Sequence, residues 1–175
     1  MKPGRAAEPL APTRTMKPEK QLAVFMARFT PAVVALARGA LARMRARFPN
    51  AIQMVYDNYN FLVIGFSPTE RPSEAIFSLA LFARGVGLCF LQAGPDLPDP
   101  EKLLRGSGKR VRNIRLENAA TLDRPAVKAL ISAALKRARV PFDATVPGRM
   151  IIKSVSAKQR PRRPPPGKRR AANRA

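Results

Sequence analysis

The chain has 175 residues and a formal net charge of +22, because 33 Lys and Arg stand against 11 Asp and Glu. It has no His and one Cys, Cys89, which excludes a zinc finger, a His-based catalytic triad and a disulfide within one chain. No apolar run approaches the roughly 18 residues of a membrane span, and the basic N-terminus lacks the apolar core of a signal peptide, so we expect a soluble cytoplasmic protein.

The charge is distributed unevenly along the chain. Residues 149–175 hold ten basic side chains and no acidic one, and the last part is also rich in proline. Proline removes backbone donors and like charges repel each other, so such a segment cannot build a packed core. We expect a disordered segment at residues 1–16, a folded domain at 17–156 and a disordered Pro/Arg/Lys-rich tail at 157–175.

Two helices are predicted at the start of the domain. Residues 18–29 place Leu22, Phe25, Met26 and Phe29 on one side. A second helix begins at Thr30-Pro31, a hydroxyl N-cap followed by proline at the first helical position, and runs to about residue 48, before a proline.

After the second helix, the spacing of apolar residues changes to one that is typical of strands. Short runs rich in Ile, Val, Phe and Leu, separated by Gly, Pro or Asn, predict an antiparallel meander. The expected strands are residues 51–57, 60–67, 75–83, 85–92 and 111–117, with 150–155 as a sixth, edge strand.

The predicted domain closes with a third helix. Residues 101–104 are expected to form a single helical turn, and the helix begins near Asp123, a good N-cap with Pro125 just inside. The order helix, helix, several strands, helix predicts an α+β domain: an antiparallel sheet of about five to six strands with helices packed on one face.

The segment Tyr56-Asp57-Asn58-Tyr59 contains both tyrosines of the chain and lies between two predicted strands. Two phenols, a carboxylate and an amide at one sheet end are groups that orient a ligand in an apolar cleft. The same residues also fit a hairpin turn with tyrosines packed at its rim, and this second interpretation is favoured.

The segment Arg105-Gly-Ser-Gly-Lys109 is a glycine-rich loop with a cation at each end. Its backbone N–H groups, with Lys109, Arg112 and Arg115, are suited to hold a phosphate or carboxylate. The glycine spacing is not that of a P-loop, and a strand follows, so no nucleotide is implied. A plain flexible loop is an equally good interpretation.

The sequence predicts no catalytic residue, no metal site and no cofactor. Cys89 stands in an apolar strand with no His to act as its base, so we expect it in the core. The carboxylates of the domain, Asp57, Glu70, Glu74 and Glu117, are scattered rather than paired. Metal sites need clustered carboxylates or imidazoles, and the positive field repels cations.

The basic tail has two interpretations of equal weight. Its cations would bind phosphate backbones without sequence selectivity, or they form a solvated tail that keeps the protein in solution. The candidate nucleic-acid-binding residues are Arg160, Arg162, Arg163, Lys168, Arg169 and Arg170. The tail has no aromatic residues to stack on bases.

Three stretches together resemble the YdhG-like family of small bacterial proteins, a domain of unknown function. They are Met54-Val-Tyr-Asp-Asn-Tyr-Asn60, Ile64-Gly-Phe-Ser-Pro-Thr-Glu70, and Leu104-Arg-Gly-Ser-Gly-Lys-Arg-Val-Arg-Asn-Ile-Arg-Leu-Glu117 with Leu122-Asp-Arg-Pro125. The resemblance covers roughly residues 20–160 and implies a compact α+β domain with an antiparallel sheet. One branch of the wider family is similar to frataxin and is described as an iron chaperone. Because this chain has no His and few acids, we do not expect that role here.

The resemblance and the residues lead to two functional hypotheses. The first is a non-enzymatic module that binds an anionic small molecule or an acidic protein in a cleft. The residues proposed for that cleft are Tyr56, Asp57, Asn58, Tyr59, Glu70, Arg71, Lys109, Arg112 and Arg115. The alternative is a nucleic-acid-associated protein that uses its basic tail.

Overall fold

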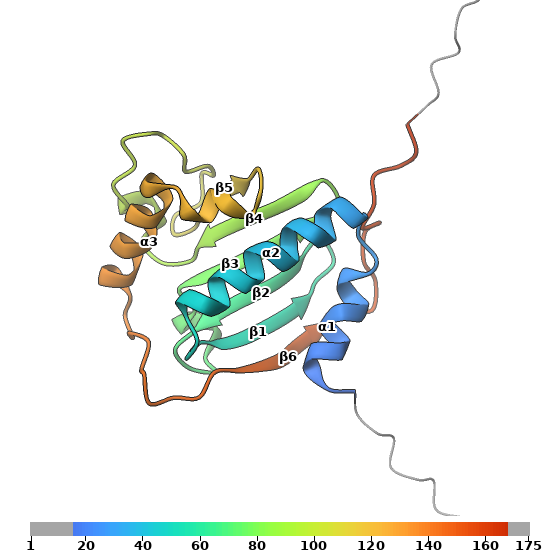
Figure 1. Ribbon diagram of the computed structural model, residues 1–175, viewed down its shortest axis with the longest axis horizontal. Coiled ribbons are helices and arrows are strands. Elements are labelled where there is room, and N and C mark those ends of the chain that lie inside the picture. Colours follow the sequence, from blue (N-terminus) through green and yellow to red (C-terminus); the bar gives the residue numbers. More distant parts are fainter. Residues whose placement is uncertain (1–15, 168–175) are drawn as a thin grey trace, which may run out of the picture.

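Two helices begin the fold, where the apolar spacing predicts them (Figure 1). In the computed structural model, which describes residues 16–167, α1 spans Pro18–Met26 and α2 spans Pro31–Arg47. The Thr30 hydroxyl accepts a hydrogen bond from the backbone N–H of Val33 at 3.4 Å, so it caps α2 as predicted.

Six strands form one sheet, in the order β5-β4-β3-β2-β1-β6. The first five form the predicted antiparallel meander, in which each strand pairs with its sequence neighbour. The strands are β1 (Ile52–Asp57), β2 (Leu62–Ser67), β3 (Phe77–Phe82), β4 (Gly85–Phe90), β5 (Arg112–Leu116) and β6 (Arg149–Val155).

The sixth strand forms, but the prediction of a wholly antiparallel sheet is wrong at this edge. β6 pairs with β1 in parallel, with Arg149 opposite Ile52. The reason is the connection: after β5, the chain passes through α3 (Pro125–Arg137) to the opposite edge of the sheet and enters β6 in the direction of β1. The sheet is therefore mixed.

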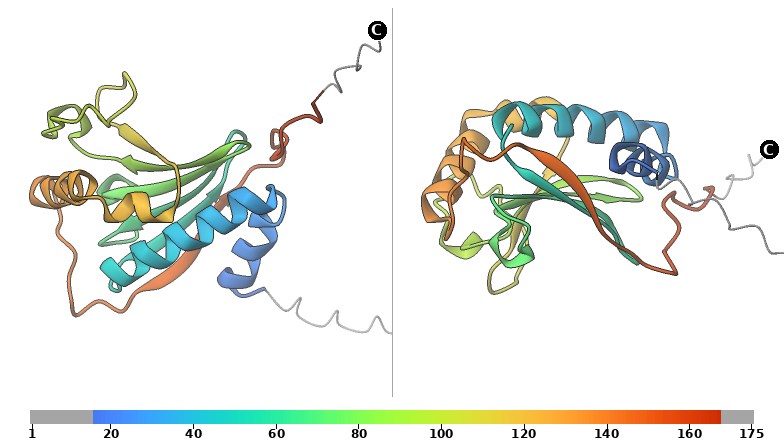
Figure 2. Two further views of the ribbon diagram at one scale, coloured as in Figure 1. Left: turned by 45° about the horizontal axis from the view of Figure 1, so that its top comes forward. Right: turned by 90° about the horizontal axis from the view of Figure 1, so that it is seen from below.

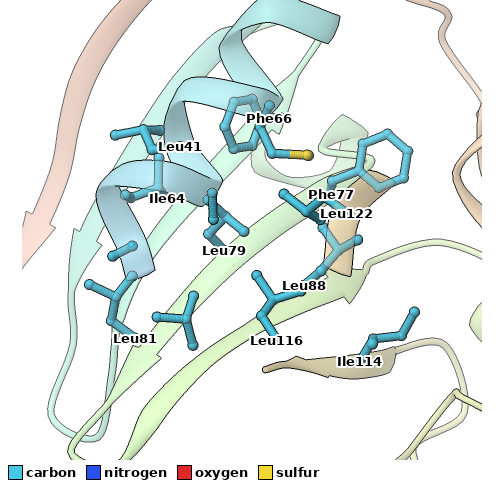
Figure 3. Close-up of a cluster of buried hydrophobic side chains, with 14 of the residues drawn as sticks. Leu41, Ile64, Phe66, Phe77, Leu79, Leu81, Leu88, Ile114, Leu116 and Leu122 are labelled. Atoms are coloured by element: carbon cyan, nitrogen blue, oxygen red, sulfur yellow. The ribbon is translucent and has the colours of Figure 1, made fainter. Parts of the chain in front are cut away.

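All three helices contribute apolar side chains to one cluster with one face of the sheet, but only α1 and α2 lie over this face as predicted, whereas α3 lies at one end of the sheet (Figure 2). Because side chains alternate along a strand, every second residue of the central strands enters this cluster. The sheet residues labelled in Figure 3 are Ile64, Phe66, Phe77, Leu79, Leu81, Leu88, Ile114 and Leu116. The opposite face holds only a small buried cluster of Ile52, Met54 and Ala75 among the described residues.

The start of α3 differs from the prediction. Its N-cap position is Arg124, without a side-chain cap, and Asp123 instead ends a short 3-10 helix, η3 (Ala119–Asp123). The Asp123 carboxylate binds Arg43 and Arg47 of α2, both at 2.7 Å. The hydrogen bond and charge of Arg43, then the charge of Arg47, lower the pKa of Asp123. Asp123 therefore ties η3 to α2.

Residues 101–104 do not form the predicted helical turn. The other short 3-10 helices are η1 (Pro72–Glu74) and η2 (Gly94–Asp96). Within residues 16–167, no helix is both long enough and apolar enough to cross a bilayer.

Gly148 provides a test of the β6 pairing. A Cβ atom at this position would lie 2.0 Å from the carbonyl oxygen of Pro49, which is backbone and cannot rotate away. We expect Gly148→Ala to displace the start of β6 and to lower the free energy of unfolding by roughly 1–3 kcal/mol, the usual range for overpacking. Urea unfolding measures the change. Gly167→Ala is the control, since a Cβ there meets no atom within 4 Å. Equal stability of both variants would contradict the close approach of Gly148 to Pro49.

Candidate functional site

The residues predicted to share a cleft do not lie together. Tyr56 of β1 and Arg115 of β5 are in one cross-strand row, with Val63, Ala80 and Gly87 between them. Four strand spacings of about 4.8 Å separate these two ends by roughly 19 Å. The prediction of one cleft lined by the tyrosine segment and the Lys109–Arg115 cations is therefore wrong.

Glu70 and Arg71 lie at a third position, in the loop after β2. Because β1 and β2 are antiparallel, this loop is at the opposite end of β1 from Asp57. Glu70 forms an ion pair with Arg149, and Arg71 lies 3.5 Å from Glu74. Both are engaged in structural contacts away from the tyrosine segment.

The predicted anion loop is exposed. Residues 105–111 all face solvent, and the two backbone hydrogen bonds between Arg105 and Asn113, at 2.8 and 2.9 Å, close the loop. Arg112 Nη1 donates to two carbonyl groups of the same loop. Lys109 has no ion pair within residues 16–167. This loop is a cationic surface at the β5 edge, without a pocket formed by the tyrosines.

The tyrosine segment contains a buried carboxylate. Asp57, at the end of β1, is 1% exposed and points to the helix-covered face. Arg28, just beyond α1, binds one of its oxygens at 2.8 Å, and Arg162 binds the other at 2.7 Å. Gln159 donates to Asp57 at 3.0 Å and accepts from Arg28 at 2.6 Å. Asp57 is therefore engaged by three internal partners and does not face an open cleft.

These contacts hold residues 156–163 against the domain, and we call this segment the strap. Its backbone N–H groups at Ser156 and Arg160 donate to the carbonyls of Asp57 and Tyr59, at 2.9 and 2.8 Å. Arg163 donates to the carbonyls of residues 27 and 28, beyond the end of α1. The strap thus joins the β1–β2 turn to the end of α1.

The boundary predicted for the tail is therefore wrong. Residues 157–163 contact the domain rather than lacking structure, and Arg162 is only 5% exposed. Its Nη2 also donates to the carbonyl of Asn58 at 2.5 Å, and its guanidinium lies 5.6 Å from the centroid of the Phe29 ring. Arg162 is consequently an internal anchor, whereas Arg160 and Arg163 are exposed. Lys168, Arg169 and Arg170 lie outside the described residues.

Burial of Arg162 has an electrostatic cost that its partners offset only in part. Its Nε and Nη1 atoms are buried and have no hydrogen-bond partner among the described residues. An unpaired guanidinium in such a position would be strongly unfavourable, so the Asp57 carboxylate is the group that permits its burial. The Phe29 ring adds a cation–π contact.

The sequence did not indicate two participants in this arrangement. Arg28 and Gln159 are separated by 131 residues, and neither belongs to a local motif. Phe61, exposed in the same turn as Tyr59, was also missed. The sequence does contain a signal that points to Phe61. The turn Asn58-Tyr-Asn-Phe61 is otherwise polar, and a second aromatic side chain is unusual in residues that only form a turn.

The metal-ligating side chains, the Cys89 thiol and the Tyr56 phenol are the groups that bear on catalytic chemistry. Within residues 16–167, His, Cys, Asp and Glu do not gather in groups of three or more that would hold a metal ion. Cys89 lies on β4, and burial raises its pKa, although a hydrogen bond with Ser78 opposes this shift. Burial also raises the pKa of Tyr56. Neither group is activated as a nucleophile at neutral pH.

The strap can be tested through its buried charge. Asp57→Asn leaves Arg162 buried without a carboxylate, so we expect the free energy of unfolding in urea to fall by about 3–5 kcal/mol. Trypsin should then cleave after Lys158 and Arg162, the strap cations that are not followed by proline, faster than in the native protein. Adding Arg162→Met to this variant should restore part of the stability, because the unpaired charge is removed.

Asp96→Asn is the matched control for the loss of one carboxylate. Asp96 is exposed and has no ion pair within residues 16–167, so the stability of this variant should change by less than about 0.5 kcal/mol. A loss in Asp57→Asn no larger than in this control would contradict the anchoring role of Asp57.

The raised pKa of Cys89 predicts slow thiol chemistry. Less thiolate is present at a given pH than in a free cysteine, so Ellman's reagent at pH 8 should react more slowly with the folded protein than with glutathione. The rate should rise on unfolding in urea. A folded protein that reacts faster than glutathione would instead indicate an activated nucleophile.

Comparisons of the chain with protein-family models, with curated proteins and with solved structures give no match. The resemblance to the YdhG-like family therefore stays a prediction from the sequence. The function has to be inferred from the charges, contacts and exposed side chains of the chain itself.

Proposed function

We propose that this protein is a non-enzymatic module that binds nucleic acid through its phosphates. The observation that carries the proposal is the strap, which fixes the start of an acid-free, strongly basic segment to the folded domain. After Asp143 the sequence contains ten basic residues and no acidic one. Anchoring at Asp57 means that the strap cations Lys158, Arg160 and Arg163 act together with the domain surface.

The wider surface supports a polyanionic partner. Residues 16–167 hold 26 basic and 10 acidic side chains, and ion pairs occupy eight of the arginines. Eighteen cations are thus left without a carboxylate partner in this part of the chain. Such a field attracts polyanions and raises the rate of their association.

The arrangement of the cations favours a polymer over a small anion. The exposed cations of the strap are Lys158, Arg160 and Arg163, which succeed one another along the chain. Two open depressions of about 460 and 380 Å³ lie elsewhere and include none of the residues predicted to bind a ligand. The repeated phosphates of a strand suit cations that succeed one another along a chain, whereas a compact ligand needs groups that converge.

The same proposal holds that the protein binds its partner without catalysing a reaction. The sequence has no His, and burial disfavours the thiolate of Cys89. Most carboxylates with a partner serve in ion pairs that join elements of the fold, as Asp57 and Asp123 do. These features support a binding role, in which the domain presents charge rather than performs a reaction.

The test is the salt dependence of binding in the full chain. We expect affinity for a 12-nucleotide strand to fall steeply with salt, because bound phosphates release counterions. Substituting Lys168, Arg169, Arg170 and Arg174 with Gln should reduce the slope of log K against log salt by roughly 3, since each phosphate contact contributes about 0.7 for a single strand. Fluorescence anisotropy of a labelled strand gives both values.

The control removes the same charge elsewhere. Lys20, Arg38, Lys128 and Lys136 are exposed on the three helices, and their substitution with Gln should leave the slope almost unchanged. A slope that falls equally in both variants would show a diffuse charge effect and contradict the role of the tail. No binding by the native chain at about 50 mM salt would show that the proposal is wrong.

A further inference from the structure

Exposed aromatic side chains gather where the strap meets the domain. Six large hydrophobic side chains are exposed within residues 16–167, and only two of them, Tyr59 at 51% and Phe61 at 45%, are aromatic. Both lie in the turn between β1 and β2. A third exposed apolar residue, Val155, ends β6 opposite Asp57. The turn itself does not need these rings, because neither is buried in the core.

The strap brings cations to the same place. The backbone N–H of Arg160 donates to the carbonyl of Tyr59 at 2.8 Å, and the Arg160 guanidinium lies 5.8 Å from the centroid of the Tyr59 ring. Lys158 and Arg163 are exposed on the same strap. The nearby carboxylate, Asp57, is buried and bound by two arginines, so it does not offset these charges for a ligand.

In the sequence, the cations of the tail and the exposed aromatic residues of the turn lie far apart. The tail has cations without aromatic residues, and the turn has aromatic residues without cations. Tertiary contacts, among them that of Arg162 with Asp57 across 105 residues and that of Arg160 with the carbonyl of Tyr59, place them side by side. The combination of a cationic track and exposed rings is the one that single-stranded nucleic acid requires, since its phosphates need charge and its unpaired bases need a surface on which to stack.

We infer that Tyr59 and Phe61 form a stacking surface for the unpaired bases of single-stranded nucleic acid, with the strap cations binding the adjacent phosphates. This inference rests on the proposed function and narrows it from nucleic acid in general to single strands. A duplex keeps its bases stacked inside, so it reaches the cations and not the rings. Selection by sequence is not expected, because every base has a face that stacks.

The chain offers a direct spectroscopic readout of Tyr59. It has no Trp and only two tyrosines, so in Tyr56→Phe the remaining tyrosine emission comes from Tyr59 alone. This full-length variant is titrated with a 12-mer of deoxythymidine, a 12-mer of uridine, a 12-bp duplex and an abasic 12-mer. We expect both single strands to quench the emission at saturation, and the duplex and the abasic strand to bind without quenching.

Affinity gives the second readout. Tyr59→Ala with Phe61→Ala should weaken binding of both single strands by about tenfold or more, since stacking on one ring is worth roughly fivefold to 100-fold. Binding of the duplex and of the abasic strand should change less than about twofold. Tyr59→Phe should keep the native affinity because it keeps the ring. Val111→Ala removes another exposed apolar side chain, 40% exposed and distant on the basic loop, and is the control.

The outcomes separate this inference from the proposed function. Unquenched Tyr59 emission at saturation, or an unchanged affinity of the double alanine variant, overturns the stacking surface while salt-dependent binding still supports the phosphate contacts. An equal loss of affinity for the single strand, the duplex and the abasic strand also overturns the stacking surface. The rings would then act only through the structure of the turn. Failure of every strand to bind at low salt overturns both proposals.

Discussion

The buried carboxylate of Asp57 is the interaction on which the position of the strap depends. It is 1% exposed and accepts hydrogen bonds from Arg28, Gln159 and Arg162, which come from two distant parts of the chain. An ion pair of this kind adds little net stability when compared with apolar packing, but the loss of one partner leaves a charge buried and unpaired. The carboxylate therefore specifies where the strap lies more than it strengthens the fold.

The small number of acidic side chains also determines the charge of the surface. With only ten carboxylates in residues 16–167, those of Asp57 and Asp123 each bind two arginines and join separate elements. Glu19 and Glu101 form exposed pairs with Arg45 and Arg124. The acids are thus used largely for internal ties, and many cations stay free for a partner. A high net charge opposes compact folding through self-repulsion, and the polyanion of the proposed function would offset this repulsion.

The positions of the glycine-rich loop and of the strap within the sheet explain why we propose the strap, rather than the loop, as the surface that binds bases. The glycine-rich loop at residues 105–111 and the strap lie near opposite edges, at β5 and at β1 with β6. A small anion cannot contact both, whereas a strand of nucleic acid spans several nanometres. The exposed aromatic residues lie only beside the strap among the described residues. In the proposed function, phosphates can therefore be bound at either edge, but bases have a surface to stack on at one of them.

The sequence by itself determined the local elements, because helix spacing, proline and hydroxyl caps and strand alternation act over a few residues. It placed α1, α2 and the first five strands within a few residues of their observed bounds. Tertiary structure alone decided the parallel pairing of β6, the use of Asp123 as a tie to α2 and the burial of Arg162. These side-chain contacts join residues 76 to 105 positions apart, and no periodicity links such positions. The composition of the tail argues against a packed core of its own, but a buried carboxylate together with backbone hydrogen bonds to the β1–β2 turn fixes its first residues on the domain.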